Sequence, residues 1–201
     1  MTGVLCRSDE CYEAGKCAFL DAPDEQFRHA VIASLIASHG PGEVCDLGCG
    51  AGHLLRFLTP RFVTRYVGVD RSANALGRIE TSAIPVSTVQ GAIEHFVPAP
   101  RAIGSLVCSE VLYYLEDPGA VLARIAAAVP ALDVMIASLI RTAAGKPNWT
   151  KGADLVTRSI AAAGWTSIER VTVAAESSGR AWEITVHRLP PTIAVDRPQG
   201  S

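Results

Sequence analysis

Blocks of apolar residues with helical spacing alternate along the chain with short, mostly apolar runs. Residues 23–39 place apolar side chains on one face, which predicts a helix that Gly40 ends. Residues 43–47 then predict a strand. After a glycine-rich turn, residues 53–58 predict a second helix, which Pro60 ends because proline cannot continue it.

The same alternation continues to the end of the chain. Ser72 precedes one of the helical runs and is predicted to cap it. Residues 165–174 and 180–189 flank a short polar turn, which predicts an antiparallel hairpin. The other predicted strands cover residues 64–70, 84–89, 103–109 and 132–140, and the other predicted helices cover residues 73–80, 120–129 and 152–163.

Strands that alternate with helices predict a parallel sheet with helices on both faces. The fold class expected is therefore α/β: a doubly wound, mostly parallel seven-stranded sheet with an antiparallel C-terminal hairpin. We expect residues 1–22 to form an N-terminal lid segment, residues 23–189 the domain itself, and residues 190–201 a flexible tail.

Composition favours a small-molecule partner. The chain has 201 residues, of which 49% are hydrophobic and 19% charged, and its formal net charge is -2. Neither disorder nor a surface for nucleic acid fits these values. No apolar run approaches the roughly 18 residues that a membrane helix needs, and the chain turns polar soon after its start. We therefore expect a cytoplasmic protein without a membrane partner, either a monomer or a homodimer.

The cysteines and histidines lack the spacings of metal sites. The six cysteines show no CxxC pair, and the five histidines show no i,i+4 pair. The sequence predicts free thiols and no metal. A zinc clip formed by Cys6, Cys11 and Cys17 is the alternative that the sequence leaves open.

The stretch VCDLGCGAG carries the first candidate chemistry. Gly48, Gly50 and Gly52 directly follow the predicted strand that contains Asp46. Glycines in such a turn let the backbone approach a ligand closely. A dinucleotide-binding loop has the spacing G-x-G-x-x-G, but here the third glycine comes one position early. Because the carboxylate of Asp46 would repel a phosphate, the turn suits a ligand with positive charge.

Asp70 ends the next predicted strand, twenty residues after Gly50. Sheets that bind nucleosides place a carboxylate there to accept hydrogen bonds from the ribose hydroxyls. A ribose next to a cationic group without phosphate describes S-adenosylmethionine, which is the cofactor expected.

The chain resembles the class I S-adenosylmethionine-dependent methyltransferases over roughly residues 24 to 189. The stretches VCDLGCGAG, VGVDRS and LVCSEVLYYLED are similar to three of their motifs, and the family's terminal antiparallel pair matches the predicted hairpin. The resemblance implies their Rossmann-like methyltransferase fold. The segments FRHA, SEVLYYLED and TKGADLV are similar to the nodulation-type N-methyltransferases, which methylate an amine of a deacetylated chitooligosaccharide.

The resemblance also implies which residues bind the cofactor. The glycines would contact its methionine part, Asp46 its ammonium, Arg28 its carboxylate and Asp70 its ribose. Gly91 and Ala92 stand where many relatives have an aspartate against the adenine, so backbone contacts would replace that side chain. The cofactor-binding residues predicted are Arg28, Asp46, Gly48, Gly50, Gly52, Asp70, Arg71, Gly91, Ala92 and Ser109.

Glu110 and Tyr113 are the catalytic candidates, because an amine must lose a proton before it attacks a methyl group. The substrate-binding candidates are Tyr12, Phe19, Tyr114, Asn148 and Trp149. The function predicted is methyl transfer to a small molecule or oligosaccharide, at the nitrogen of an amine or aminosugar. The alternatives are an O-methyltransferase of a small natural product, a cofactor-binding protein without catalysis, and an NAD-linked reductase.

Overall fold

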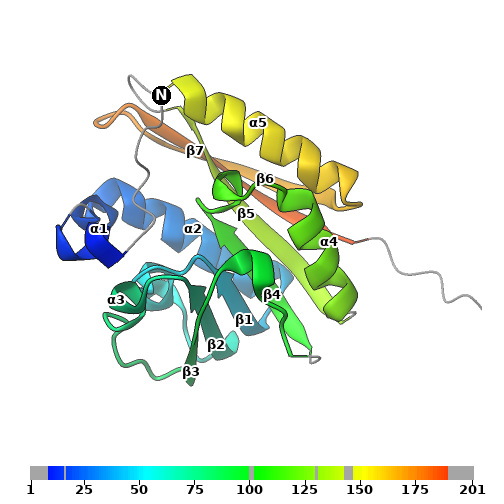
Figure 1. The fold of residues 1–201 in the computed structure, drawn as a ribbon, viewed down its shortest axis with the longest axis horizontal. Helices are drawn as coiled ribbons and strands as arrows, with labels where there is room; N and C mark the ends of the chain where they lie inside the picture. Colours follow the sequence, from blue (N-terminus) through cyan, green and yellow to red (C-terminus); the bar gives the residue numbers. More distant parts are fainter. Residues whose placement is uncertain (1–8, 16, 100–101, 130, 143–146, 190–201) are drawn as a thin grey trace, which may run out of the picture.

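Seven strands form one sheet through the middle of the protein (Figure 1). The coordinates are a computed structural model that describes residues 9–15, 17–99, 102–129, 131–142 and 147–189. The predicted tail, residues 190–201, lies outside them. The strands are β1 (Gly42–Leu47), β2 (Val63–Asp70), β3 (Val86–Gln90), β4 (Ile103–Ser109), β5 (Leu132–Thr142), β6 (Thr166–Ala175) and β7 (Arg180–Arg188).

Helices connect most of these strands. The α-helices are α1 (Asp9–Glu13), α2 (Pro23–His39), α3 (Ala73–Leu76), α4 (Pro118–Ala128) and α5 (Pro147–Ala162). Short 3-10 helices are η1 (Ala18–Asp21), η2 (His53–Phe57), η3 (Ile93–His95) and η4 (Leu112–Tyr114).

The strand order is β3-β2-β1-β4-β5-β7-β6. The first five strands are parallel, and β7 runs antiparallel to both β5 and β6. The predicted fold class and the predicted hairpin are therefore confirmed. The winding reverses between β1 and β4, and in such sheets ligands bind beyond the carboxyl ends of the strands at this reversal.

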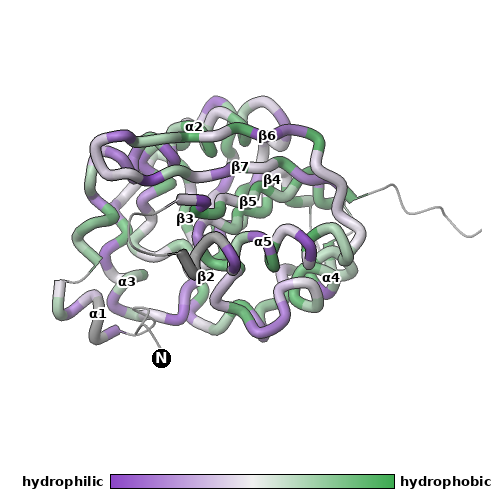
Figure 2. The backbone as a smooth tube through the Cα atoms, turned by 90° about the horizontal axis from the view of Figure 1, so that it is seen from above, coloured by the Kyte–Doolittle hydropathy of each residue, from purple (hydrophilic) through white to green (hydrophobic). Residues whose placement is uncertain are grey.

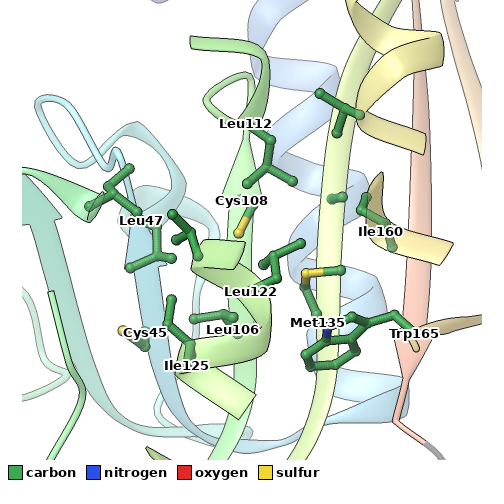
Figure 3. Packing of buried hydrophobic residues seen from close by; sticks show 14 of the residues in the cluster. Cys45, Leu47, Leu106, Cys108, Leu112, Leu122, Ile125, Met135, Ile160 and Trp165 are labelled. Atoms are coloured by element: carbon green, nitrogen blue, oxygen red, sulfur yellow. The ribbon is translucent and has the colours of Figure 1, made fainter. Parts of the chain in front are cut away.

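Helices cover both faces of the sheet, and each face has its own hydrophobic cluster. Figure 2 shows α2 on one side of the central strands and α4 and α5 on the other. Side chains of β1, β4 and β5 meet those of α4 and α5 in one cluster (Figure 3). Residues 134–140 of β5 are buried without a break, as expected for a strand covered on both faces.

Two predicted helices are shorter than the sequence pattern suggests. The segment after the glycine turn forms only the five-residue 3-10 helix η2. Pro60 follows closely and disfavours helical geometry in the residue before it, so a full α-helix has no room to extend. The helix after β2 has four residues and ends at Gly77, and the predicted cap is confirmed because the Ser72 hydroxyl accepts from the Ala75 N–H (3.0 Å).

Among the helices in the described part of the chain, none is long and apolar enough to cross a membrane.

The packing of α4 on the sheet predicts where the fold is sensitive to a lost side chain. Leu122 of α4 is fully buried in the cluster of Figure 3, whereas Leu155 of α5 is 55% exposed. Leu122→Ala should lower the free energy of unfolding by about 2–5 kcal/mol, because it leaves a cavity. Leu155→Ala makes the same chemical change and should cost less than about 1 kcal/mol. Urea unfolding of both variants measures the difference, and equal losses would contradict this packing.

Candidate functional site

The turn after β1 depends on its glycines. Gly48, Gly50 and Gly52 all have positive φ angles, of 71°, 56° and 74°. A Cβ atom at Gly48 would lie 2.5 Å from the Val111 side chain. Residues other than glycine rarely adopt this backbone conformation, so the three glycines give the turn its course.

Asp70 fastens this turn to the end of β2. Its Oδ2 accepts a hydrogen bond from the Gly50 N–H (2.8 Å), and its Oδ1 accepts one from the Ser72 N–H (2.9 Å). The structure thus brings together the two sequence features that suggested a nucleoside. Each carboxylate oxygen keeps a lone pair for a further donor.

The next strand end leaves open space beside Asp70. The Gly91 N–H donates to the Asp70 carbonyl (2.9 Å), and a Cβ at Gly91 would meet no atom within 4 Å. Ala92 is the residue before η3, and Arg71 is exposed. A flat group could therefore lie against this backbone without displacing a side chain.

Asp46 lies on β1, two residues before Gly48, and is 3% exposed. Its Oδ2 accepts a hydrogen bond from the hydroxyl of Tyr66 on β2 (2.8 Å). Burial raises the pKa of Asp46 to about 7, against the opposing effects of the hydrogen bond from Tyr66 and of the Arg28 guanidinium. A cation close to this carboxyl would lower its pKa again and be attracted by the carboxylate.

Arg28 extends from α2 to the end of β4. It donates to the Ser109 hydroxyl and to Oε2 of Glu25 (2.6 Å), and it is 2% exposed. Its Nε has no hydrogen-bond partner within the described residues. Because a buried N–H normally finds an acceptor, this side chain suits a carboxylate ligand.

Glu110 follows β4 in a strained conformation. In the described ranges it is the one residue other than glycine with a positive φ angle (59°). Its N–H donates to the Ser138 carbonyl (2.9 Å), and its Oε2 accepts from the Tyr113 hydroxyl (2.5 Å). Such strain persists where the surroundings enforce it, often at functional sites.

Burial gives Glu110 an unusual acidity for a carboxyl group. It raises the pKa of Glu110 to about 7, against the opposing effects of Arg28 and of the hydrogen bond from Tyr113. A carboxyl with this pKa can gain or lose a proton near neutral pH, as a general acid or base must.

Helix α1 covers the glycine turn. The Tyr12 hydroxyl lies 2.7 Å from the position that a Cβ at Gly50 would take. Asp9 Oδ1 accepts from the Ser72 hydroxyl (2.5 Å) and from the Asn74 N–H of α3 (3.1 Å), and Arg78 donates to the Tyr12 carbonyl (2.7 Å). Figure 1 shows α1 beside α3. Tyr12, a substrate-binding candidate, is thus placed at the turn that the sequence assigned to the cofactor.

The other substrate-binding candidates lie on different elements. Phe19 is 48% exposed, and the Arg180 guanidinium lies 5.8 Å from its ring centroid. The rings of Tyr113 and Tyr114 meet edge to face at 4.7 Å. Asn148 and Trp149 belong to the first turn of α5, where side chains lie outside the described residues.

The cysteines of the alternative zinc clip lie mostly outside the described residues. Cys6 and the side chain of Cys11 fall outside the described part, so the structure does not test a zinc clip with Cys17. Among the side chains that it does describe, no three His, Cys, Asp or Glu lie together as metal ligands would.

The sequence predictions did not include Glu25, Tyr66, Ser138 or Arg180, which contact residues of the candidate site or their partners. Glu25 precedes Arg28 by three positions on the helix, a spacing that signals a side-chain pair. Tyr66 and Arg180 gave no comparable signal, because their partners are far away in the sequence. Arg180 donates to Oε1 of Glu25 (3.0 Å) across 155 positions.

A family comparison identifies most of the domain. The family model described as "Methyltransferase domain" matches residues 24–163. None of the curated proteins compared with the chain matches it.

Solved structures with the same fold include several enzymes. The N-methyltransferase NodS from Bradyrhizobium japonicum WM9 in complex with S-adenosyl-L-homocysteine has a TM-score of 0.68 and 22% identity, over 85% of this chain and 90% of NodS. Magnesium protoporphyrin IX methyltransferase from Synechocystis PCC 6803 has a TM-score of 0.65 and 14% identity, over 83% of this chain and 84% of its own. The cyclase SpnF has a TM-score of 0.64 and 13% identity, over 82% of this chain and 80% of its own. At these identities the likeness shows the fold alone.

The geometry of the turn predicts opposite effects at two glycines. Gly50→Ala should lower the free energy of unfolding by about 1–2 kcal/mol, because a Cβ strains the left-handed backbone and meets the Tyr12 hydroxyl. Gly91→Ala meets no atom, so it should leave stability unchanged or raise it by up to about 1 kcal/mol. Chemical denaturation measures both values. Equal destabilisation would contradict the described turn.

Proposed function

The chain belongs to the methyltransferase-domain family and is an S-adenosylmethionine-dependent methyltransferase, and we propose that it methylates the nitrogen of an amine or aminosugar. The acceptor is a small molecule or an oligosaccharide. The observation that carries the proposal is the partly buried carboxyl of Glu110 at the end of β4, with a pKa raised to about 7. The N-methyltransferase named among the structures of the same fold is consistent with it.

The described site has groups for each part of the cofactor. S-adenosylmethionine supplies, when bound, a methyl group on a positively charged sulfur. We assign the ribose hydroxyls to Asp70, which has free acceptor capacity at both oxygens. We assign the cofactor carboxylate to Arg28, whose buried Nε lacks a partner among the described residues. We assign the cofactor ammonium to Asp46 on β1, directly or through water.

The remaining cofactor contacts rely on backbone. Gly48, Gly50 and Gly52 present a chain without side chains to the methionine part. We assign the adenine to the open space at Gly91 and Ala92, with Arg71 at its edge. Ser109 accepts from Arg28 and so helps to hold the guanidinium at this position.

Glu110 is the proposed acceptor of the substrate proton. An aliphatic amine is protonated at neutral pH, with a pKa near 10, and must lose its proton before nitrogen can attack. The ionised Glu110 attracts the ammonium by charge. Its pKa near 7 then lets it take the proton, because burial has made its carboxylate more basic than an exposed one.

The same carboxyl favours nitrogen over oxygen. An aliphatic hydroxyl holds its proton far more tightly than an ammonium, so a carboxylate with a pKa near 7 is too weak a base for it. Tyr113, which donates to Glu110, and Tyr114, which packs against Tyr113, add aromatic rings near this carboxyl. The faces of such rings attract ammonium groups, including methylated ones.

Radiolabelled S-adenosylmethionine and a panel of acceptors test the proposal. Aliphatic amines and aminosugars should be labelled, and matched alcohols and unsubstituted sugars should not. Labelling of hydroxyl groups alone would establish the O-methyltransferase alternative. Cofactor affinity without labelling of any acceptor would favour the alternative of a binding protein.

The rate of methyl transfer should follow the ionisation of Glu110. The value of kcat/KM for the amine should rise with pH through about 7, because it reports the free enzyme, in which the carboxyl must be ionised to accept a proton. Tyr113→Phe removes a hydrogen bond that stabilises the ionised form, so the midpoint should move to higher pH. A pH profile of kcat/KM for the amine, recorded for both proteins, measures the shift. A midpoint that moves to lower pH would contradict the role of Glu110.

Glu110→Gln isolates the proton transfer from the fold. The variant should lose about 10²- to 10⁴-fold in kcat and retain its affinity for S-adenosyl-L-homocysteine. Glu116→Gln is the matched control, because Glu116 is exposed a few residues later in the same segment, and it should keep full activity. A Glu110→Gln variant with normal kcat would refute the assignment.

A further inference from the structure

Arg28 is the last member of a chain of alternating charges that passes through a residue of another element. Oε2 of Glu25 accepts from Arg28 (2.6 Å), and Oε1 of the same carboxylate accepts from Arg180 (3.0 Å). Arg180 also lies 3.4 Å from Oδ2 of Asp24. The order is therefore acid, base, acid, base, and the final base lies at the end of β4.

This charge chain connects α2 to the C-terminal hairpin. Asp24, Glu25 and Arg28 lie within α2, whereas Arg180 is the first residue of β7. Trp182 follows on β7, and the Arg28 guanidinium lies 6.0 Å from the centroid of its ring. The start of β7 is thus linked to Arg28 in two ways. Arg180 binds the Glu25 carboxylate that Arg28 also binds, and the Trp182 ring lies near the Arg28 guanidinium.

The burial of these groups makes their pairing consequential. The side chains of Arg28 and Glu25 are 2% and 5% exposed, and that of Arg180 is 29% exposed. A buried charge without a partner is costly, so Arg28 requires an acid beside it. An acid that neutralised Arg28 completely would, however, weaken its attraction for a second carboxylate.

We propose that Arg180 is a positioning residue that holds Glu25 so that Arg28 presents its free donors to the amino-acid carboxylate of the cofactor. Arg180 binds Oε1 of Glu25, so this carboxylate cannot accept hydrogen bonds from Arg28 with both of its oxygens. Arg28 then keeps its contact with Ser109 and its remaining donors. The inference rests on the proposed cofactor role of Arg28.

Removal of the Arg180 side chain should weaken the binding of only one part of the cofactor, its amino-acid carboxylate. In Arg180→Gln both oxygens of Glu25 become available to Arg28, and Asp24 loses its cation. The Arg28 guanidinium then moves away from Ser109 at the end of β4 and toward Glu25, which neutralises more of its positive charge. Affinity for the cofactor carboxylate falls, whereas the contacts of the nucleoside part are unchanged.

Two ligands separate these parts in a calorimetric titration. S-adenosyl-L-homocysteine carries the amino-acid carboxylate, and 5′-methylthioadenosine lacks it. Arg180→Gln should weaken the binding of S-adenosyl-L-homocysteine by about tenfold, on the order of one charge-assisted hydrogen bond. Its affinity for 5′-methylthioadenosine should stay within about twofold, which also shows that the variant is folded. Arg180→Lys retains a cation for Glu25 and should recover part of the loss.

Arg170→Gln provides the matched control. Arg170 lies on the same hairpin, is 56% exposed and pairs with Glu183 rather than Glu25. This variant should bind both ligands as the wild type does. The inference is overturned if Arg180→Gln binds S-adenosyl-L-homocysteine normally, or if its affinity for both ligands falls equally. Failure of the wild type to bind either ligand would instead overturn the proposed cofactor site.

Kinetics give an independent reading of the same role. For Arg180→Gln, KM for S-adenosylmethionine should rise about tenfold with kcat within about twofold, because the charge chain acts on binding. A fall in kcat with unchanged KM would show that Arg180 acts elsewhere.

Discussion

The hydrogen bond from the Gly50 N–H to the Asp70 carboxylate joins the ends of two neighbouring strands and gives the candidate site its form. It fixes the turn after β1 against the tip of β2, and it does so with a carboxylate that can still accept hydrogen bonds from a ligand. Glycine makes this approach possible in two ways. It adopts the positive φ angles of the turn, and at Gly50 it leaves room for Tyr12, which a side chain would meet. The backbone and the acid therefore form one surface.

Two carboxyls and one guanidinium lie near this surface, and we propose a different role for each. Asp46 and Glu110 are carboxyls whose pKa values burial raises to about 7, and Arg28 opposes the rise at both. Asp46 lies on β1, just before the glycine turn, and Glu110 directly follows β4. In the proposed function a cationic ligand is held at Asp46, a cationic acceptor is deprotonated at Glu110, and Arg28, whose charge acts on both carboxyls, binds the anionic group.

The sequence predicted what local patterns determine. Periodicity predicted the strands and the hairpin, and the glycine spacing together with Asp70 indicated a nucleoside. It overestimated η2, because periodicity does not register how little chain lies between Gly52 and Pro60. The resemblance indicated Arg28, and the end of the fourth predicted strand indicated Glu110, but neither predicted the contact from Arg180 or the strain at Glu110. These depend on how distant elements pack, which no local pattern encodes. The domain limits and the residue roles stay predictions.

The most direct test of the account is the affinity of the purified chain for S-adenosyl-L-homocysteine, measured by calorimetry for the wild type and for Asp70→Asn. The account predicts saturable binding by the wild type and at least about tenfold weaker binding by the variant, since an amide cannot both hold the turn and accept from the ribose. Asp133→Asn, an exposed site at the start of β5, should bind normally. Absence of binding by the wild type, or equal affinity in Asp70→Asn, would contradict it.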